Sequence, residues 1–520
     1  MSEPISLHDL NIDKDIEEYQ NKQSKKSKFK SPVESILTTD FMAKLHEEGE
    51  RERQRLRRIW EENGSKGRPP SKLSANHVAI VLKAHTRVIQ LQSNKTDSSP
   101  PVYVYMADEG IYTSNRATIN RYMRAIEHQM VKRDQNEAYY FLQDTTEIAE
   151  RTNDRHKIPV KNGIFNLKTK QLEEFTPNEV FTTKVNTNYI ADPVHPSFKD
   201  GWHVDNWLME VSDNDEEVYN LLWQVIADSI NGNYSRKRSI WLVGEGANGK
   251  GTYQDLIRHL VGTVNAASLK IDQFGGNSSG QNFNLAMLEG KTVNIGDDVQ
   301  SGVYVDDSSN FNSVVTGDPV IVEHKGQMGY VVEFNMTIIQ STNGLPRIKN
   351  KTHGTYRRFL IVPFLKQFDG DTANYDIKEK YIKDEKVLEY VLQKAVHIDF
   401  EEFDIPVISN EMLEQFKVSN DPVLEFYNEE FKPVMSELQL DRIPRQTAHD
   451  MFNLYSRQRN YKPMGYNNFI TQFDKLTKND YIVAQRKWLQ KDKGALRYHI
   501  LHPEETHPQV GQNLQSYVKK

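Results

Sequence analysis

The sequence predicts a multidomain α/β protein. Its parts are a phosphate-loop core with a parallel sheet flanked by helices, an N-terminal α+β domain and a C-terminal winged-helix-like domain. Three observations predict this fold class. A strand-like run, "RSIWLV", breaks into a glycine-rich loop and continues as an amphipathic helix. Further strand-like runs end in polar clusters, as strands of open α/β sheets do at their ligand-binding edge. Near the C-terminus, two helical patterns precede two β-like runs.

The length indicates several domains. At about 150 residues per domain, 520 residues correspond to roughly three or four compact units. We expect a charged, flexible arm over residues 1–74, an α+β domain over 75–235, the phosphate-loop core over 236–366, a helical segment over 367–440 and the winged-helix-like domain over 441–520.

Composition excludes several classes of protein. No apolar run approaches the roughly 18 residues needed to span a bilayer, and the N-terminus lacks a secretory signal, so we expect a cytoplasmic protein without a membrane partner. Zero cysteines exclude disulfides and thiolate zinc sites, and the 16 histidines form no HExxH pair. The net charge of −6 requires that any contact with nucleic acid be local.

The N-terminal third combines a charged arm with mixed secondary structure. One helix is expected at 41–62, and the arm is either a solubilising tail or a segment that binds nucleic acid or a partner. Helical spacing follows in "HVAIVLKAHTRVIQL" and "INRYMRAIEHQM", and "VYVYMADEGIY" predicts a strand pair. Residues 158–177 predict two strands joined at 168–170, and residues 205–230 are helical.

The loop after "RSIWLV" fits the pattern G-x-x-x-x-G-K. In such a loop, backbone N–H groups and the N-terminus of the next helix point at phosphate oxygens, and the lysine neutralises their charge. An ordinary glycine-rich turn is the alternative. The residue after the lysine, usually a hydroxyl ligand of Mg²⁺, is glycine, so the threonine that follows is a weak metal candidate. The candidate nucleotide-binding residues are Gly244, Gly246, Ala247, Asn248, Gly249, Lys250, Gly251 and Thr252.

Acidic and amide side chains follow the next two strand-like runs. Asp297 and Asp298 end "KTVNIGDD", and Asn343 ends "FNMTIIQSTN". We expect Asp297 to hold Mg²⁺, Asp298 to orient or deprotonate the attacking water, and Asn343 to bind the γ-phosphate and that water. A solvated acidic pair and a plain Asn-Gly turn are the alternatives.

An arginine pair, Arg357 and Arg358, precedes a last apolar strand. Such pairs usually lie on the surface, but at a subunit boundary one can act as an arginine finger on a neighbour's nucleotide.

The order of these motifs resembles that of the superfamily-three helicases. Within that superfamily, the motif order is similar to that of the poxvirus, phage and plasmid primase-helicase group. The motifs are, in order, the phosphate loop, the Asp-Asp strand, "TGDPVIVEHKGQ", a strand ending in "STNGLP", and "YRR" before "VPF". The resemblance covers roughly Ile158 to Phe364, because "NGIFNLKTKQLEEFTP" also resembles the entry to the family's pre-ATPase domain.

The resemblance implies an AAA+-like ATPase that uses ATP and Mg²⁺ for replication of a phage or other mobile element in a bacterial cytoplasm. It implies a hexameric ring around single-stranded DNA at a fork, with origin DNA and a primase as further partners. The hairpin at 316–332 would grip DNA through His324 and Lys325, and family spacing favours Arg358 as the finger. We do not expect priming by this chain, because the region before Ile158 is short for a primase domain and lacks the catalytic acidic triad or zinc element that the resemblance associates with one.

Two other functions remain open. An origin-binding or helicase-loading ATPase would use the C-terminal domain without unwinding. A nucleotide kinase is suggested by Lys-Gly-Thr, but no arginine-rich lid follows the loop.

Overall fold

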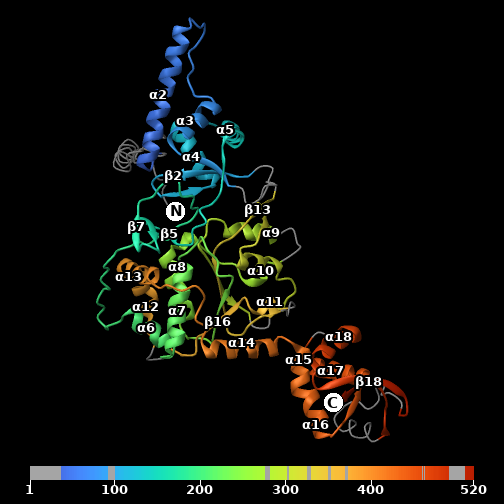
Figure 1. The fold of residues 1–520 in the computed structure, drawn as a ribbon. Helices are drawn as coiled ribbons and strands as arrows, with labels where there is room; N and C mark the ends of the chain where they lie inside the picture. The colour runs from blue at the N-terminus through green and yellow to red at the C-terminus, as the bar shows by residue number, and fades with distance from the viewer. Residues whose placement is uncertain are drawn as a thin grey trace, which may run out of the picture. The chain divides into compact units, whose positions relative to one another are not determined.

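The computed structural model describes residues 37–91, 100–275, 281–300, 304–324, 329–348, 353–368, 373–459, 461, 463–490 and 510–520. The chain forms two compact units (Figure 1). Unit 1 contains Met1–Asn153 and Glu174–Thr183, and unit 2 contains Asp154–Glu173 and Lys184–Lys520. Within the described ranges, none of the helices has the length and apolar character needed to cross a bilayer.

Unit 1 is a small α+β unit around a four-stranded sheet in the order β3-β2-β1-β4. β1 pairs antiparallel with β2 and parallel with β4. Buried side chains of α2 to α5 cover the sheet. The elements are α2 (Asp40–Glu62), α3 (Ala75–His85), β1 (Val88–Leu91), β2 (Val102–Met106), β3 (Ile111–Thr113), α4 (Arg116–Ile126), α5 (Lys132–Thr145) and β4 (Ile148–Ala149).

Two features of unit 1 differ from the sequence prediction. The helix predicted over 77–91 is wrong for its last four residues, which form β1. The β-branched residues Val88 and Ile89 pair with β2 instead of extending α3. The helix expected at 41–62 is present as α2, but its first turns are not a flexible arm. Phe41 and Leu45 are buried in the core of unit 1.

The centre of unit 2 is a five-stranded sheet in the order β16-β8-β14-β10-β9. Every neighbouring pair in it is parallel, which confirms the predicted parallel sheet. Its strands are β8 (Ser239–Val243), β9 (Ala266–Ala267), β10 (Val293–Val299), β14 (Thr337–Thr342) and β16 (Phe359–Pro363). Because all strands run the same way, their carboxyl ends meet along one edge.

Helices cover both faces of this sheet. Ile240 and Leu242 of β8 join a core that includes α7 (Glu216–Ser229), α8 (Lys250–Val261) and α13 (Glu385–Val396). The alternate residues Trp241 and Val243 face the opposite core, which includes α10 (Ser309–Thr316) and α14 (Val407–Ser419). This alternation is what a strand buried on both faces requires.

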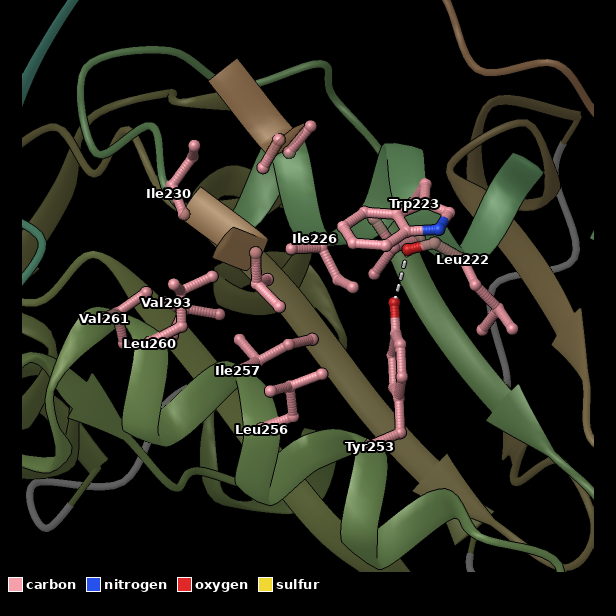
Figure 2. Packing of buried hydrophobic residues seen from close by; sticks show 14 of the residues in the cluster. Leu222, Trp223, Ile226, Ile230, Tyr253, Leu256, Ile257, Leu260, Val261 and Val293 are labelled. Carbon is pink, nitrogen blue, oxygen red and sulfur yellow. Dashed lines mark hydrogen bonds between the residues drawn. The ribbon is translucent and has the colours of Figure 1, made fainter. Parts of the chain in front are cut away.

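The helix that follows the phosphate loop is fixed by its apolar stripe. Figure 2 shows Tyr253, Leu256, Ile257 and Leu260 of α8 pointing into the core between α7 and the sheet. The buried Tyr253 hydroxyl donates a hydrogen bond to the Leu222 carbonyl of α7 at 2.6 Å. Packing of α8 between α7 and the sheet therefore fixes the position of its first turn and of the loop that precedes it.

Smaller elements complete the core and the segment before it. A three-stranded sheet, β5-β6-β7, replaces the two strands predicted at 158–177, because the chain also turns at 161–162. These elements are β5 (Lys157–Val160), β6 (Gly163–Asn166), β7 (Gln171–Glu173), α6 (Val204–Val211), η1 (Thr263–Asn265), η2 (Ile271–Gln273), α9 (Gln281–Leu285), η3 (Ala286–Leu288), β11 (Tyr304–Val305), β12 (Val320–Val322), β13 (Tyr330–Val332), β15 (Arg347–Ile348) and α11 (His353–Tyr356).

The C-terminal part is helical and ends in a three-stranded sheet, β17-β19-β18. The two predicted helices are present as α17 and α18. β18 pairs antiparallel with β19, and the β-like run predicted at 495–502 lies outside the described residues. The elements are α12 (Tyr375–Glu379), η5 (Tyr381–Lys383), α15 (Pro422–Phe426), η6 (Tyr427–Phe431), α16 (Lys432–Glu437), β17 (Arg442–Pro444), α17 (Arg445–Gln458), α18 (Tyr466–Thr477), β18 (Tyr481–Lys487) and β19 (Asn513–Lys519).

Candidate nucleotide-binding site

The glycine-rich loop connects the end of β8 to the start of α8. Ala247 has φ +57° and Gly249 has φ +86°, so successive backbone N–H groups turn to one side, a conformation typical of anion-binding nests. The Asn248 side chain donates to the Phe364 carbonyl at 3.0 Å, and the Phe368 N–H donates to the Ala247 carbonyl at 2.7 Å. The loop is thus braced against the chain that leaves β16.

Lys250, the first residue of α8, is buried, and its ammonium points into the loop. It donates to the Gly244 carbonyl at 2.5 Å, and to Oδ1 of Asn248 and Asn343 at 3.1 Å and 3.3 Å. Burial lowers the pKa of Lys250, and the carboxylates of the Asp pair oppose that shift. A single cation therefore joins the ends of β8 and β14.

The Asp pair lies where the regular pairing of β10 with β14 is interrupted, between Gly296 and Val299. Asp298 has φ +50°, which is rare for a residue with a side chain and occurs mostly at constrained sites. The Ser341 hydroxyl donates to Oδ1 of Asp297 at 2.6 Å and accepts the Asp298 N–H at 3.1 Å. One hydroxyl on β14 therefore fixes both acidic residues.

These groups surround one cavity of about 320 Å³ at the carboxyl edge of the parallel sheet. The sequence-predicted residues that line it are Gly246, Ala247, Asn248, Gly249, Lys250, Gly251, Thr252, Asp297, Asp298 and Asn343. Gly244 lies beneath the loop, where an added Cβ would be 2.1 Å from the Phe364 carbonyl oxygen. Carboxylate, hydroxyl and amide oxygens are the donors that Mg²⁺ prefers, so Asp297 and Thr252 fit this ion chemically.

The arginine pair lies at the amino ends of the parallel strands, opposite the cavity. Arg358 directly precedes β16, whose first residue pairs with Ser239 at the start of β8. The length of β8 separates that edge from the loop, on the order of 15 Å at about 3.3 Å per residue. The Arg358 guanidinium donates to the Gly354 carbonyl at 2.6 Å, while Arg357 is exposed. The structure therefore does not bring Arg358 to the cavity of its own chain.

The predicted hairpin is present, but His324 is not a free side chain. β12 and β13 pair antiparallel. The Nε2 atom of His324 lies 2.7 Å from a Glu289 carboxylate oxygen and 3.1 Å from the Tyr330 hydroxyl, which donates to Glu289 at 2.6 Å. The hydrogen bond to Glu289 raises the pKa of His324. Lys325 lies outside the described residues.

Sequence reasoning missed three residues that line the cavity, Ser341, Thr342 and Lys378. Ser341 belongs to the polar cluster "STN", so its position at the end of a strand was a usable signal. Lys378 comes from α12, beyond the sheet, and no local pattern sets it apart from the lysines around it.

Three family models match parts of the chain. The model described as "D5 N terminal like" matches residues 72–213, and "Poxvirus D5 protein-like" matches residues 418–504. Models of D5-like proteins thus match the chain on both sides of the phosphate-loop core, which supports a likeness to the D5-like primase-helicase family. Between these ranges, "Family of unknown function (DUF5906)" matches residues 242–358, which include the loop, the Asp pair and Asn343.

One curated protein and two solved structures are similar to parts of this chain. "Putative helicase L207/L206" of Acanthamoeba polyphaga mimivirus is 23% identical over 217 residues. The match covers 41% of this chain and 22% of the length of that relative. The A form of the NrS-1 C-terminal region has a similar fold, with a TM-score of 0.50 and 12% identity over 86% of this chain and 100% of that structure. A second structure of that region has a TM-score of 0.48 and 11% identity.

Proposed function

We propose that this protein is a ring-forming, ATP-dependent DNA helicase that translocates on single-stranded DNA during replication of a phage or other mobile element. The observation that carries the proposal is the convergence of loop, Asp pair and Asn343 around one cavity at the carboxyl edge of the sheet. This is the edge at which open α/β sheets bind ligands. The name of the mimivirus relative and the matches to the models of D5-like proteins support the helicase activity.

The predicted residues of the cavity divide into phosphate, metal and water ligands. The loop N–H groups and Lys250 bind the β- and γ-phosphates, because a helix N-terminus and an ammonium both attract negative charge. Asp297, with Thr252 as a second candidate, would hold Mg²⁺, which supplies charge neutralisation on the phosphates when bound. Asp298 orients or deprotonates the attacking water, and Asn343 binds the γ-phosphate and that water. The Ser341 hydroxyl positions the Asp297 carboxylate and the backbone of Asp298.

The position of the arginine pair favours a role in a neighbouring subunit. Arg358 lies at the opposite edge of the sheet from its own loop, so it can reach a nucleotide only across a subunit boundary. This arrangement fits a homo-hexameric ring in which each site is completed by the adjacent subunit. Arg357 is the alternative finger, because its side chain is exposed.

DNA would be gripped inside the ring by the β12–β13 hairpin. Lys325 remains the candidate for the phosphate contact on sequence grounds. His324 is bound to Glu289 and Tyr330, so we assign it to the base of the hairpin rather than to its DNA-contacting tip. Movement of this hairpin during the ATPase cycle would draw single-stranded DNA from a fork.

A second function, origin binding or helicase loading, is favoured by the charge of the C-terminal part. Residues 441–520 contain 14 Lys and Arg against 7 Asp and Glu, a net charge of +7 in a chain that carries −6. The order of α17, α18 and the β18–β19 ribbon is that of a winged helix, and such a basic domain fits duplex DNA. A primase is a further expected partner.

The experiment that tests the function compares wild type with Asp298→Asn. Wild type should hydrolyse ATP, with stimulation by single-stranded DNA, and should form rings visible by mass photometry. Asp298→Asn should bind ATP normally and turn it over at least about a hundredfold more slowly, as expected for loss of a catalytic base. Wild-type turnover by this variant would remove Asp298 from the mechanism. Rings that hydrolyse ATP but never unwind a fork would favour the loader.

A further inference from the structure

The cavity is lined by a second basic side chain, which comes from outside the parallel sheet. Lys250 and Lys378 are the two basic residues among the described residues that line it. Lys378 lies on α12, a helix C-terminal to the last strand of the sheet. Two separate parts of the chain therefore direct an ammonium toward the same cavity.

The Lys378 ammonium lies beside the first turn of α8. Its Nζ would be 3.7 Å from a Cβ built on Gly251. Gly251 occupies the position at which phosphate loops usually carry a hydroxyl, so this chain has no side chain there. The ammonium therefore lies next to the Gly251 backbone, and both residues line the cavity.

The present partner of Lys378 can be exchanged for phosphate. Nζ lies 3.3 Å from Oδ2 of Asp255, and the Lys378 side chain is 50% exposed. Exposed pairs of this kind contribute little stability, because water screens them. Asp255 also pairs with Arg258 at 3.0 Å, so it keeps a cationic partner when Lys378 leaves.

The helix that carries Lys378 is anchored. Asn374 caps α12 and also donates to a carboxylate oxygen of Asp200 at 2.8 Å. The Tyr381 hydroxyl, just beyond α12, donates to the same oxygen at 3.1 Å, and Ile382 is fully buried in the core beside α8. Only the lysine side chain needs to move to reach a phosphate.

We propose that Lys378 is a second cationic ligand of the nucleotide phosphates, supplied in the same chain by α12. This inference rests on the proposed ATP site and adds a residue to it. Each phosphate adds negative charge, so the contribution of Lys378 grows with the number of phosphates. Bound nucleotide would join the helical segment after the sheet to the phosphate loop.

The test is a set of dissociation constants for ATP, ADP and adenosine, measured on the full chain with fluorescent analogues. Lys378→Ala should weaken ATP binding by about tenfold or more, the effect of losing one charge-assisted hydrogen bond. ADP should lose less and adenosine nothing. Lys378→Arg should restore most of the affinity. Lys380→Ala is the matched control, because Lys380 pairs with Asp376 of α12 at 2.9 Å and does not line the cavity.

Asp255→Asn separates phosphate binding from a structural role of the ion pair. If Lys378 acts on phosphate, this variant should bind ATP at least as tightly as wild type, because it frees the ammonium. An equal loss of ATP affinity in Asp255→Asn and Lys378→Ala would overturn the inference, as would a loss that is the same for adenosine. Wild-type affinity of Lys378→Ala would overturn it while leaving the ATP site intact. Failure of the wild-type chain to bind ATP would instead refute the proposed function and this inference together.

Discussion

Ser341→Ala should slow ATP turnover without abolishing ATP binding. The hydroxyl makes two hydrogen bonds, to the Asp297 carboxylate at 2.6 Å and from the Asp298 N–H at 3.1 Å. A hydrogen bond to a charged group contributes about 1.5–3 kcal/mol and one between neutral groups about 1 kcal/mol. Water from the open cavity can replace part of this, so we expect the barrier to rise by about 2 kcal/mol, or roughly 30-fold in rate.

The assay pairs steady-state phosphate release with a separate measurement of ATP affinity. Affinity should change by less than about threefold, because the loop and Lys250 are untouched. Ser229→Ala is the control, because Ser229 is also a buried residue and its hydroxyl donates to the Val225 carbonyl at 2.7 Å, within α7. An unchanged rate for Ser341→Ala, or an equal loss in both variants, would refute the view that Ser341 positions the Asp pair.

Three further predictions follow from other parts of unit 2. Arg358→Ala should bind ATP but not hydrolyse it. Mixing it with Lys250→Ala should restore some ATPase activity, because some interfaces then pair an intact loop with an intact arginine. No recovery in rings proven to be mixed would exclude a role in trans. Because the pKa of His324 is raised in the folded state, its pair with Glu289 stabilises the fold fully below about pH 6.5 and is lost as pH rises through the raised pKa. Denaturant unfolding should therefore show that Glu289→Gln costs more stability at pH 6 than at pH 9, and an equal cost at both would contradict the pair. Tyr253→Phe should lower the free energy of unfolding by about 1 kcal/mol through its lost hydrogen bond, and an unchanged denaturant midpoint would contradict that value.

Local signals explain why so much of the site was predictable. The strand, loop and helix around Lys250 are adjacent in sequence, and their residue types are dictated by backbone conformation. Asp297 and Asp298 lie near the carboxyl end of β10, and Asn343 directly follows β14, so the parallel sheet alone brings them to one edge. The order of the strands, with β14 between β8 and β10, could not be derived from any single segment.

The parts that sequence reasoning missed depend on contacts between distant segments. Lys378 reaches the cavity because α12 packs beside α8, more than a hundred residues away in the chain. His324 was expected at the DNA-binding tip of the hairpin. Its imidazole is instead hydrogen-bonded to Glu289, which precedes the hairpin in the chain. The residues of β1 continue the helical spacing of apolar residues in α3, so the sequence predicted a helix there. Pairing with β2 makes them a strand.

Unwinding of a forked DNA duplex by wild type and Lys250→Ala tests the central claim most directly. Both proteins should be assayed with ATP and with a non-hydrolysable analogue, over the same range of concentrations. The account predicts strand separation by the wild type with ATP alone, and none by Lys250→Ala or with the analogue. Equal unwinding by Lys250→Ala, or no unwinding by a wild type that hydrolyses ATP, would contradict the claim that this cavity powers a DNA motor.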